Sequence, residues 1–187
     1  RLIENEDFVN TPNWTSIRFK IDNGDWWDYK TAQFSQYTKK LCLKTGVFSK
    51  EFVVDLGDGK QVKITSSRFA SMDNPHLAIL KYTLTPLNFS GKITIQSGID
   101  GAIENRGVNR YNSLNQKHLQ AISQSVKDNF VQVITQTVQS KIDIAVSQKL
   151  SLAINGESAS TSSTSVLNDG QAFAEFSVLA KVNECIS

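Results

Sequence analysis

Carboxyl groups gather at two places along this chain of 187 residues. Glu4, Glu6 and Asp7 form the first group, and Asp100 and Glu104 form the second. Acid and base catalysis at a glycosidic bond needs two carboxyl groups about 5 to 10 Å apart whose pKa values differ. Sequence spacing does not establish that distance, and loop carboxylates that are solvated or hydrogen-bonded are the more common case. Both interpretations stay open at this point.

Three tryptophans form a second kind of candidate site. An aromatic face can stack on the apolar face of a sugar ring, so Trp14, Trp26 and Trp27 could bind a carbohydrate. Trp26 and Trp27 are adjacent, and on a strand their side chains would point to opposite sides. At most one of the two therefore belongs to a core. Packing within a core or between domains is favoured over a sugar platform.

Other catalytic and metal-binding motifs are missing from the sequence. His76 and His118 have no neighbouring partner at metal-ligand spacing. There is no Gly-x-Ser-x-Gly elbow and no phosphate-binding Gly/Lys loop. Cys42 and Cys185 lie far apart within alternating patterns, which predicts two reduced residues that are buried or half-buried. We therefore expect no metal site.

The composition bounds the class of protein. Lys and Arg number 20 and Asp and Glu number 18, and no basic run alternates with aromatic residues, so neither a nucleic acid nor an anionic membrane is expected as a partner. No apolar window approaches the roughly 18 residues that span a bilayer. Residues 1–7 are charged rather than signal-like, which favours a cytoplasmic location. With 40% hydrophobic residues, the chain can bury one core.

Alternating polar and apolar residues predict two hairpins in the first half of the chain. One joins residues 77–85 to residues 92–97 across a connection rich in Pro, Asn and Gly. The other follows residues 17–21, because Asn23 and Gly24 accept positive φ in a two-residue turn. Its return strand would run through Trp26, Trp27 and Tyr29.

The remaining patterns predict further strands. Residues 37–69 should form a three-stranded meander, since Gly-containing turns separate its alternating runs. Residues 112–128 show neither period and are expected to be a long loop, with at most one helical turn. Alternation returns over residues 130–154, and Asn-Asp-Gly at 168–170 predicts a final hairpin rather than a linker. Ten or more strands without a convincing helix predict an all-β fold, an antiparallel β-sandwich of two large sheets.

Residues 100–111, DGAIENRGVNRY, are dense in charged and amide side chains. They contain too few apolar residues for a core strand. Such a segment is either a solvated loop or a polar network at one end of a sheet. A polar network persists where its hydrogen-bonding groups are satisfied by a partner.

Several blocks of sequence, in the same order, resemble the N-terminal domain of glycoside hydrolase family 65, which holds the maltose, trehalose, kojibiose and nigerose phosphorylases. The blocks are ENEDFVN at 4–10 with PNW at 12–14, GVF at 46–48, RFASM at 68–72, PHLA at 75–78, and DG, ENRGV and Tyr within 100–111. The similarity covers most of residues 1–120 and is only a β pattern from Phe130 onward.

The resemblance implies a β-supersandwich of the galactose-mutarotase-like kind, which agrees with the predicted strands. It also implies that the parent enzyme performs inverting phosphorolysis. In that reaction phosphate attacks the anomeric carbon of an α-glucosyl disaccharide, a glutamic acid protonates the leaving oxygen, and β-glucose 1-phosphate is released. The family's catalytic acid and phosphate site belong to a following (α/α)6 barrel, so no catalytic residue is expected here. Neither a metal nor an organic cofactor is implied.

The resemblance further implies that this domain packs on its own barrel, contributes to a homodimer and lends a loop to the rim of the sugar site. Candidates for the substrate rim or for contact between domains are Asn5, Trp14, Glu104, Asn105, Arg106 and Tyr111. We expect residues 1–187 to form a single sandwich domain, truncated at both ends because the sequence starts and stops abruptly. A stand-alone carbohydrate-binding module and a structural or dimerising domain are the alternatives.

Overall fold

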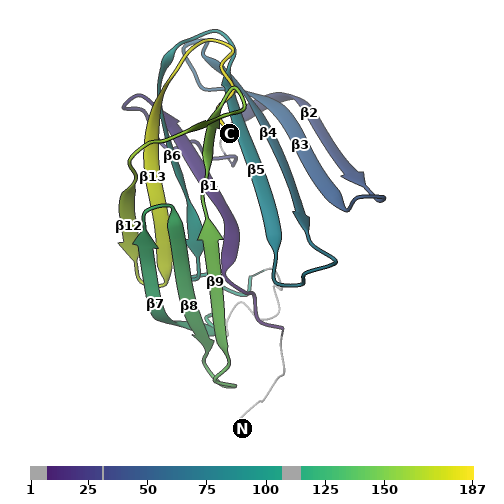
Figure 1. Ribbon diagram of the computed structural model, residues 1–187, viewed down its shortest axis with the longest axis vertical. Helices are drawn as coiled ribbons and strands as arrows, with labels where there is room; N and C mark the ends of the chain where they lie inside the picture. Colours follow the sequence, from purple (N-terminus) through teal and green to yellow (C-terminus); the bar gives the residue numbers. More distant parts are fainter. Residues whose placement is uncertain (1–7, 31, 107–114) are drawn as a thin grey trace. The chain divides into compact units, whose positions relative to one another are not determined.

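The computed structural model describes residues 8–30, 32–106 and 115–187, and in these residues it contains strands and no helix (Figure 1). The strands are β1 (Asn13–Ile21), β2 (Gln33–Cys42), β3 (Val47–Asp55), β4 (Gln61–Ala70), β5 (Ala78–Pro86), β6 (Gly91–Asp100), β7 (Leu119–Lys127), β8 (Phe130–Thr137), β9 (Asp143–Lys149), β10 (Leu152–Ile154), β11 (Glu157–Ala159), β12 (Thr164–Asn168) and β13 (Gln171–Ala180). The predicted all-β fold is confirmed.

The strands of the described residues form four sheets, with the orders β1-β6-β13-β12, β2-β3-β4-β5, β7-β8-β9 and β10-β11, so the prediction of two large sheets is wrong. The predicted meander over residues 37–69 is confirmed as β2, β3 and β4, and β5 adds a fourth strand to it. The predicted final hairpin is confirmed as well. Asn168 pairs with Gln171 across a turn in which Gly170 has a φ of 70°, a conformation that glycine adopts without steric cost.

The chain divides into two compact units. The first unit comprises Arg1–Ile17, Gln96–Leu150 and Ser163–Glu175, and the second comprises Arg18–Ile95, Ser151–Ser162 and Phe176–Ser187. Each unit has its own buried residues.

The core of the first unit lies between strands of two sheets. Ile99 of β6 and Ala172 and Ala174 of β13 pack with Val131 and Val133 of β8, and all five are at most 1% exposed. Val126, Val146 and Leu150 pack around this cluster. Complete burial of a Val or Ile side chain is worth about 1.5–3 kcal/mol, so these side chains hold the two layers together. This packing is that of a β-sandwich.

The second unit buries one face of the sheet β2-β3-β4-β5. Val54 lies beside Val62, and Ile64 lies beside Leu84, and all four are fully buried. Phe19 of β1 and Ile93 of β6, which belong to another sheet, are fully buried as well. Ile186 bridges to Leu84 through both backbone hydrogen bonds and is 1% exposed, so the last residues of the chain complete this sheet.

The hairpin predicted for residues 77–97 is wrong. Strand β5 pairs with β4, whereas β6 lies between β1 and β13 in a different sheet. The connection between them stays on β4: Asn88 Oδ1 accepts the Gln61 N–H at 2.9 Å, and Asn88 Nδ2 donates to the Gly59 carbonyl at 2.7 Å. The Pro, Asn and Gly residues therefore connect two different sheets, although their sequence is typical of a hairpin loop.

The return strand predicted through Trp26, Trp27 and Tyr29 is also wrong, because residues 25–28 have no regular structure. One backbone hydrogen bond, from the Trp27 N–H to the Phe19 carbonyl at 2.8 Å, returns to β1. The positive φ of the turn falls on Asp22, at 50°, rather than on Asn23 and Gly24. Asp22 is fixed there because its Oδ1 accepts the Lys92 N–H of β6 at 2.9 Å.

The long loop predicted for residues 112–128 is wrong over residues 119–127, which form β7. The register between β7 and β8 shifts between Ala121 and Ser123. A bulge inserts one residue and moves the inward face from odd to even positions. The half-buried residues of β7 accordingly change from Leu119 and Ala121 to Gln124 and Val126. Because of this change, the sequence of β7 does not show one continuous period of two.

Both cysteines are free, as predicted. Cys42 is half-buried, in agreement with the prediction, but Cys185 is exposed, so the prediction of burial is wrong for that residue. Cys185 precedes Ile186, and alternation along the backbone turns the Ile186 side chain inward and the thiol outward.

Candidate functional site

The polar loop that follows β6 is anchored at its first residues. Asp100 Oδ1 accepts the Ala102 N–H at 3.0 Å and the Gln171 Nε2 at 2.8 Å. The Gly101 N–H donates to the Gly170 carbonyl at 2.9 Å. Gly101 is buried so closely that an added Cβ would lie 2.8 Å from that carbonyl oxygen. The start of the loop is therefore fixed against the β12–β13 turn of the same unit.

Asn105 joins this loop to the segment before β1. Its Oδ1 accepts the Asn10 N–H at 2.9 Å, and its Nδ2 donates to the Phe8 carbonyl at 2.9 Å. Asn10 Nδ2 in turn donates to the Glu104 carbonyl at 3.1 Å. The Asn105 N–H donates to the Gln116 carbonyl at 3.0 Å. We call this set, Phe8–Asn10 with Glu104–Arg106, the asparagine clamp.

Glu104 and Arg106 form an ion pair at the edge of the asparagine clamp. Arg106 Nη2 lies 2.7 Å from Glu104 Oε2, and Arg106 Nε donates to the same oxygen at 2.8 Å. The Glu104 side chain is 24% exposed, whereas that of Arg106 is 78% exposed. An exposed pair of this kind contributes about 0–1 kcal/mol to stability. The guanidinium retains further N–H donors, which could bind an anionic or hydroxyl group.

The structure brings part of the predicted site together. The Glu104 carbonyl and the Asn105 side chain contact the segment 8–10, and Arg106 pairs with Glu104. Trp14 is half-buried on β1, and no hydrogen bond or ring contact among the described residues joins it to the clamp. Asn5 and Tyr111 lie outside the described residues.

Sequence reasoning missed Asn10 and Phe8 as members of this arrangement. Asn10 carries both a donor and an acceptor, and Asn105 has the same pair of groups 95 positions later. The only available signal was that Asn side chains often satisfy nearby backbone groups in irregular segments. That signal does not identify a partner so distant in sequence.

The side chains of the adjacent residues Trp26 and Trp27 have different partners in the second unit. The Trp27 ring stacks on Phe19 at 5.5 Å and on Phe52 at 6.1 Å, so it belongs to an aromatic cluster. Cations of Arg18 and Lys20 lie 4.5 Å and 5.0 Å from the centre of the Trp26 ring. These contacts favour packing over a carbohydrate platform for the two rings.

Three titratable groups of the second unit have shifted pKa values. The Lys92 N–H, followed by the ammonium of Lys60, lowers the pKa of Asp22. Hydrogen bonds from the hydroxyl and backbone of Thr45 lower the pKa of the Cys42 thiol. Burial raises the pKa of Tyr82. The shifts of Asp22 and Cys42 arise from local hydrogen bonds, and that of Tyr82 arises from burial.

Two further classes of site are not found in residues 8–30, 32–106 and 115–187. No three His, Cys, Asp or Glu side chains come together there as potential ligands of one metal ion. No helix in this part of the chain is long and apolar enough to cross a membrane.

Comparison with protein families gives one match that spans residues 2–187, to the family described as glycosyl hydrolase family 65, N-terminal domain. An uncharacterized glycosyl hydrolase of Mycobacterium tuberculosis is 34% identical over 155 residues, which are 83% of this chain and 12% of that protein. A kojibiose phosphorylase of Halothermothrix orenii is 26% identical over 180 residues, which are 96% of this chain and 22% of that protein. The chain thus spans less than a quarter of the length of these relatives.

A solved structure with a similar fold is that of a putative kojibiose phosphorylase from the human microbiome. Its TM-score is 0.75 at 14% identity, and the match covers 96% of this chain and 22% of the other. At this identity the similarity establishes the fold alone. It agrees with the β-sandwich described above.

Proposed function

The chain belongs to glycosyl hydrolase family 65 and corresponds to the N-terminal domain of that family. We propose that it is part of a longer enzyme that phosphorolyses an α-glucosyl disaccharide. The observation that carries this proposal is the family match over residues 2–187, together with a relative named as a kojibiose phosphorylase that aligns with 96% of the chain. The family resemblance of the sequence is thereby confirmed.

In the proposed reaction, inorganic phosphate displaces the second sugar from the anomeric carbon of the glucosyl unit with inversion. The C–O bond of the glycoside breaks, a new C–O bond to phosphate forms, and a glutamic acid gives its proton to the leaving oxygen. The products are β-glucose 1-phosphate and a free sugar. We assign the acid and the phosphate site to an (α/α)6 barrel elsewhere in the polypeptide.

Within this division of labour, the asparagine clamp is the part of the domain that we assign to the sugar-site rim or to the contact with the barrel. The hydrogen bonds of Asn105 hold Phe8 and Arg106 near one another in the first unit. Arg106 is mostly exposed and Phe8 is fully exposed, so both are accessible to a partner. Trp14, Asn5 and Tyr111 remain candidates for the same role.

The experiment that tests the function is an assay of the full-length enzyme against maltose, trehalose, kojibiose and nigerose, with and without phosphate. We expect glucose 1-phosphate from one of these sugars only when phosphate is present. Release of free glucose at the same rate without phosphate would make the enzyme a hydrolase and contradict the proposal. The 187-residue chain alone should release no glucose 1-phosphate, and turnover by it would contradict the assignment of catalysis to the barrel.

The oligomeric state, the location and the cofactor requirement are proposed from the family resemblance. We propose a homodimeric, cytoplasmic enzyme without a metal or organic cofactor, in which the two compact units of this chain act as one domain. Disaccharide and phosphate bind mainly to the barrel, and maltose is among the candidate substrates. Light scattering of the full-length protein tests the dimer, because a monomeric mass at micromolar concentration would contradict it.

A further inference from the structure

The sheet β2-β3-β4-β5 of the second unit has two faces of different chemistry. In the register of the strands, Phe34 lies beside Val54, Leu41 beside Phe48, and Phe52 beside Ile64, and residues paired in this way point to the same side of a sheet. We call this side, where it carries Phe34, Tyr37, Leu41, Phe48 and Phe52, the aromatic face. The opposite side carries Ser35, Ser49, Thr65 and Thr83, which are polar residues typical of a solvated face.

The aromatic face continues the core of the second unit into solvent. Phe52 stacks on Trp27, which stacks on the fully buried Phe19. In the other direction the Phe52 ring lies 5.9 Å from that of Phe34 and 5.7 Å from that of Tyr37. Phe34 is 50% exposed, and Leu41 is 54% exposed. A contiguous apolar surface of this kind marks an interaction site.

The charges on the aromatic face are all positive. Lys39, Lys50 and Arg68 lie on it, with the Lys50 ammonium 5.6 Å and the Arg68 guanidinium 5.2 Å from the centre of the Phe48 ring. The carboxylates of the four strands, Glu51 and Asp55, lie on the opposite side, where Glu51 pairs with Lys63 at 3.0 Å. None of the three cations has a carboxylate partner within the described residues. The aromatic face is therefore complementary to an acidic surface.

We propose that the aromatic face is the docking site for an acidic, partly apolar surface of the same polypeptide outside residues 1–187. This inference rests on the proposed function, because it requires the longer enzyme of which this chain is a domain. The relatives leave ample length for such a surface, since the chain covers 12% and 22% of two of them.

A second copy of this chain is a poorer occupant of the aromatic face. A two-fold contact would place Lys39, Lys50 and Arg68 against the same three cations, and like charges in contact are costly. Addition of a strand to the free edge of β2 is opposed as well. That edge carries Lys39 and Lys40 and a register shift between Ser35 and Thr38, and lysines and bulges are the devices that keep sheet edges from pairing.

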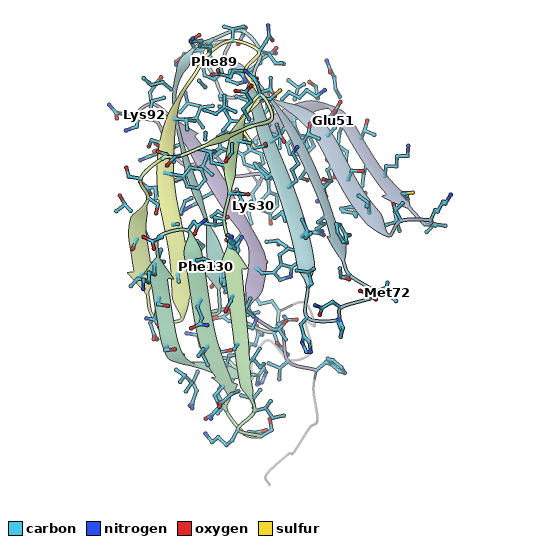
Figure 2. The ribbon with its side chains drawn as sticks, viewed as in Figure 1. Lys30, Glu51, Met72, Phe89, Lys92 and Phe130 are labelled. Carbon is cyan, nitrogen blue, oxygen red and sulfur yellow. The ribbon has the colours of Figure 1, made fainter. Side chains whose placement is uncertain are left out.

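The first test compares two phenylalanines in the full-length protein by hydroxyl-radical footprinting. Phe34 and Phe130 are 50% and 53% exposed in this chain, so their oxidation rates would be similar if nothing covered either one. Phe130, the first residue of β8, is labelled in Figure 2. We expect Phe34 to be oxidised several-fold more slowly than Phe130. Equal rates would overturn the proposal. Protection of Phe34 that depends on protein concentration, or that requires added single-stranded oligonucleotide, would also overturn it, in favour of a second copy or a nucleic acid.

The second test reverses the charges on the aromatic face. The triple variant Lys39→Glu, Lys50→Glu and Arg68→Glu should bring the oxidation rate of Phe34 up to that of Phe130. A matched control with the same net charge, Lys40→Glu, Lys44→Glu and Lys81→Glu, changes exposed residues on the opposite side or in a turn and should leave Phe34 protected. Equal protection of Phe34 in the two variants would overturn the proposal that the partner surface is acidic.

The outcome is separable from that of the proposed function, because phosphorolysis is measured on the same unmodified protein. Protection of Phe34 in an enzyme that does not need phosphate supports the docking site and contradicts the reaction. Phosphate-dependent turnover with an unprotected Phe34 supports the reaction and contradicts the docking site.

Discussion

The loop after β6 and the strand β2 contrast sharply in composition and in burial. Residues 101–106 are a polar segment without regular structure, yet Gly101 is buried and Ile103, Glu104 and Asn105 are half-buried. β2 is a hydrogen-bonded strand that carries Phe34, Tyr37 and Leu41, yet nine of its ten residues are exposed. Hydrogen bonds from distant residues hold the loop, whereas β2 is paired along only one of its edges.

The contrast shows that regular secondary structure and burial are separate properties. A polar loop can be fixed when each of its donors and acceptors finds a partner. A strand at the edge of a sheet needs only one neighbour for its backbone, so its side chains can remain exposed until another surface covers them. The backbone of the loop is therefore fixed by contacts within this chain, whereas β2 exposes apolar side chains that another surface can cover.

The largest expected effect concerns β6, the strand that carries the loop. A Cβ added at Gly98 would lie 2.1 Å from the Ala172 carbonyl oxygen and 2.6 Å from the Phe173 Cα, so β6 and β13 would have to separate. We expect Gly98→Ala to lower the free energy of unfolding by about 3 kcal/mol or more, as measured by urea denaturation.

Gly59→Ala is the matched control, because nothing lies within 4 Å of its added Cβ and its φ is 72°. Its cost is that of an alanine at positive φ, about 1 kcal/mol. If the two substitutions destabilise the chain equally, then close packing at β6 does not support the loop, and the contrast with β2 fails.

The next effect concerns the asparagine clamp itself. Asn105→Ala removes one acceptor and one donor from Asn10 and Phe8 and should cost about 1–2 kcal/mol. Hydrogen exchange at the Asn10 amide should accelerate. Asn105→Asp keeps the acceptor for that amide and loses the donor to Phe8, so its effect should be intermediate. An unchanged exchange rate in the Ala variant would show that the loop is held without the clamp.

A smaller, pH-dependent effect is expected at Asp22, whose side chain ties a turn of the second unit to β6. The Lys92 N–H lowers the pKa of Asp22 below its ordinary value of 3.8. A carboxyl group with a depressed folded-state pKa stabilises the fold above its unfolded-state pKa, and this contribution disappears as the pH falls through the folded-state value.

The stability advantage of the wild type over Asp22→Asn should therefore be complete at pH 7 and vanish in acid below the ordinary pKa. Denaturation midpoints of the two proteins across this range provide the measurement. An advantage that grows as the pH falls would have the wrong sign and would contradict the role of the carboxylate.

The smallest effect is expected on β2. Leu41→Ser removes an exposed side chain and should change the free energy of unfolding of the 187-residue chain by no more than about 0.5 kcal/mol. Leu84→Ala, in the buried core of the same sheet, should cost about 2–5 kcal/mol. A large loss in Leu41→Ser would show that β2 is already covered within this chain, and would remove the contrast with the loop.

The sequence by itself determined the class of fold, the meander, the final hairpin and the family. These features depend on local alternation, on glycine-containing turns such as the one at Gly170, and on blocks of residues that stay in order. Residues 77–85 and 92–97 were recognised as strands for the same reason. Their periods are properties of neighbouring residues and need no knowledge of distant contacts.

Only the tertiary structure decided which strands share a sheet and which polar groups meet. The connection at Asn88 crosses between sheets because its side chain binds Gln61 and Gly59, and the bulge near Ala121 disguises a strand as a loop. Asn105 meets Asn10 across 95 positions, and Phe34 is 50% exposed on β2, at the edge of its sheet. Pairing over such distances is set by the packing of the whole chain, and local sequence carries no record of it.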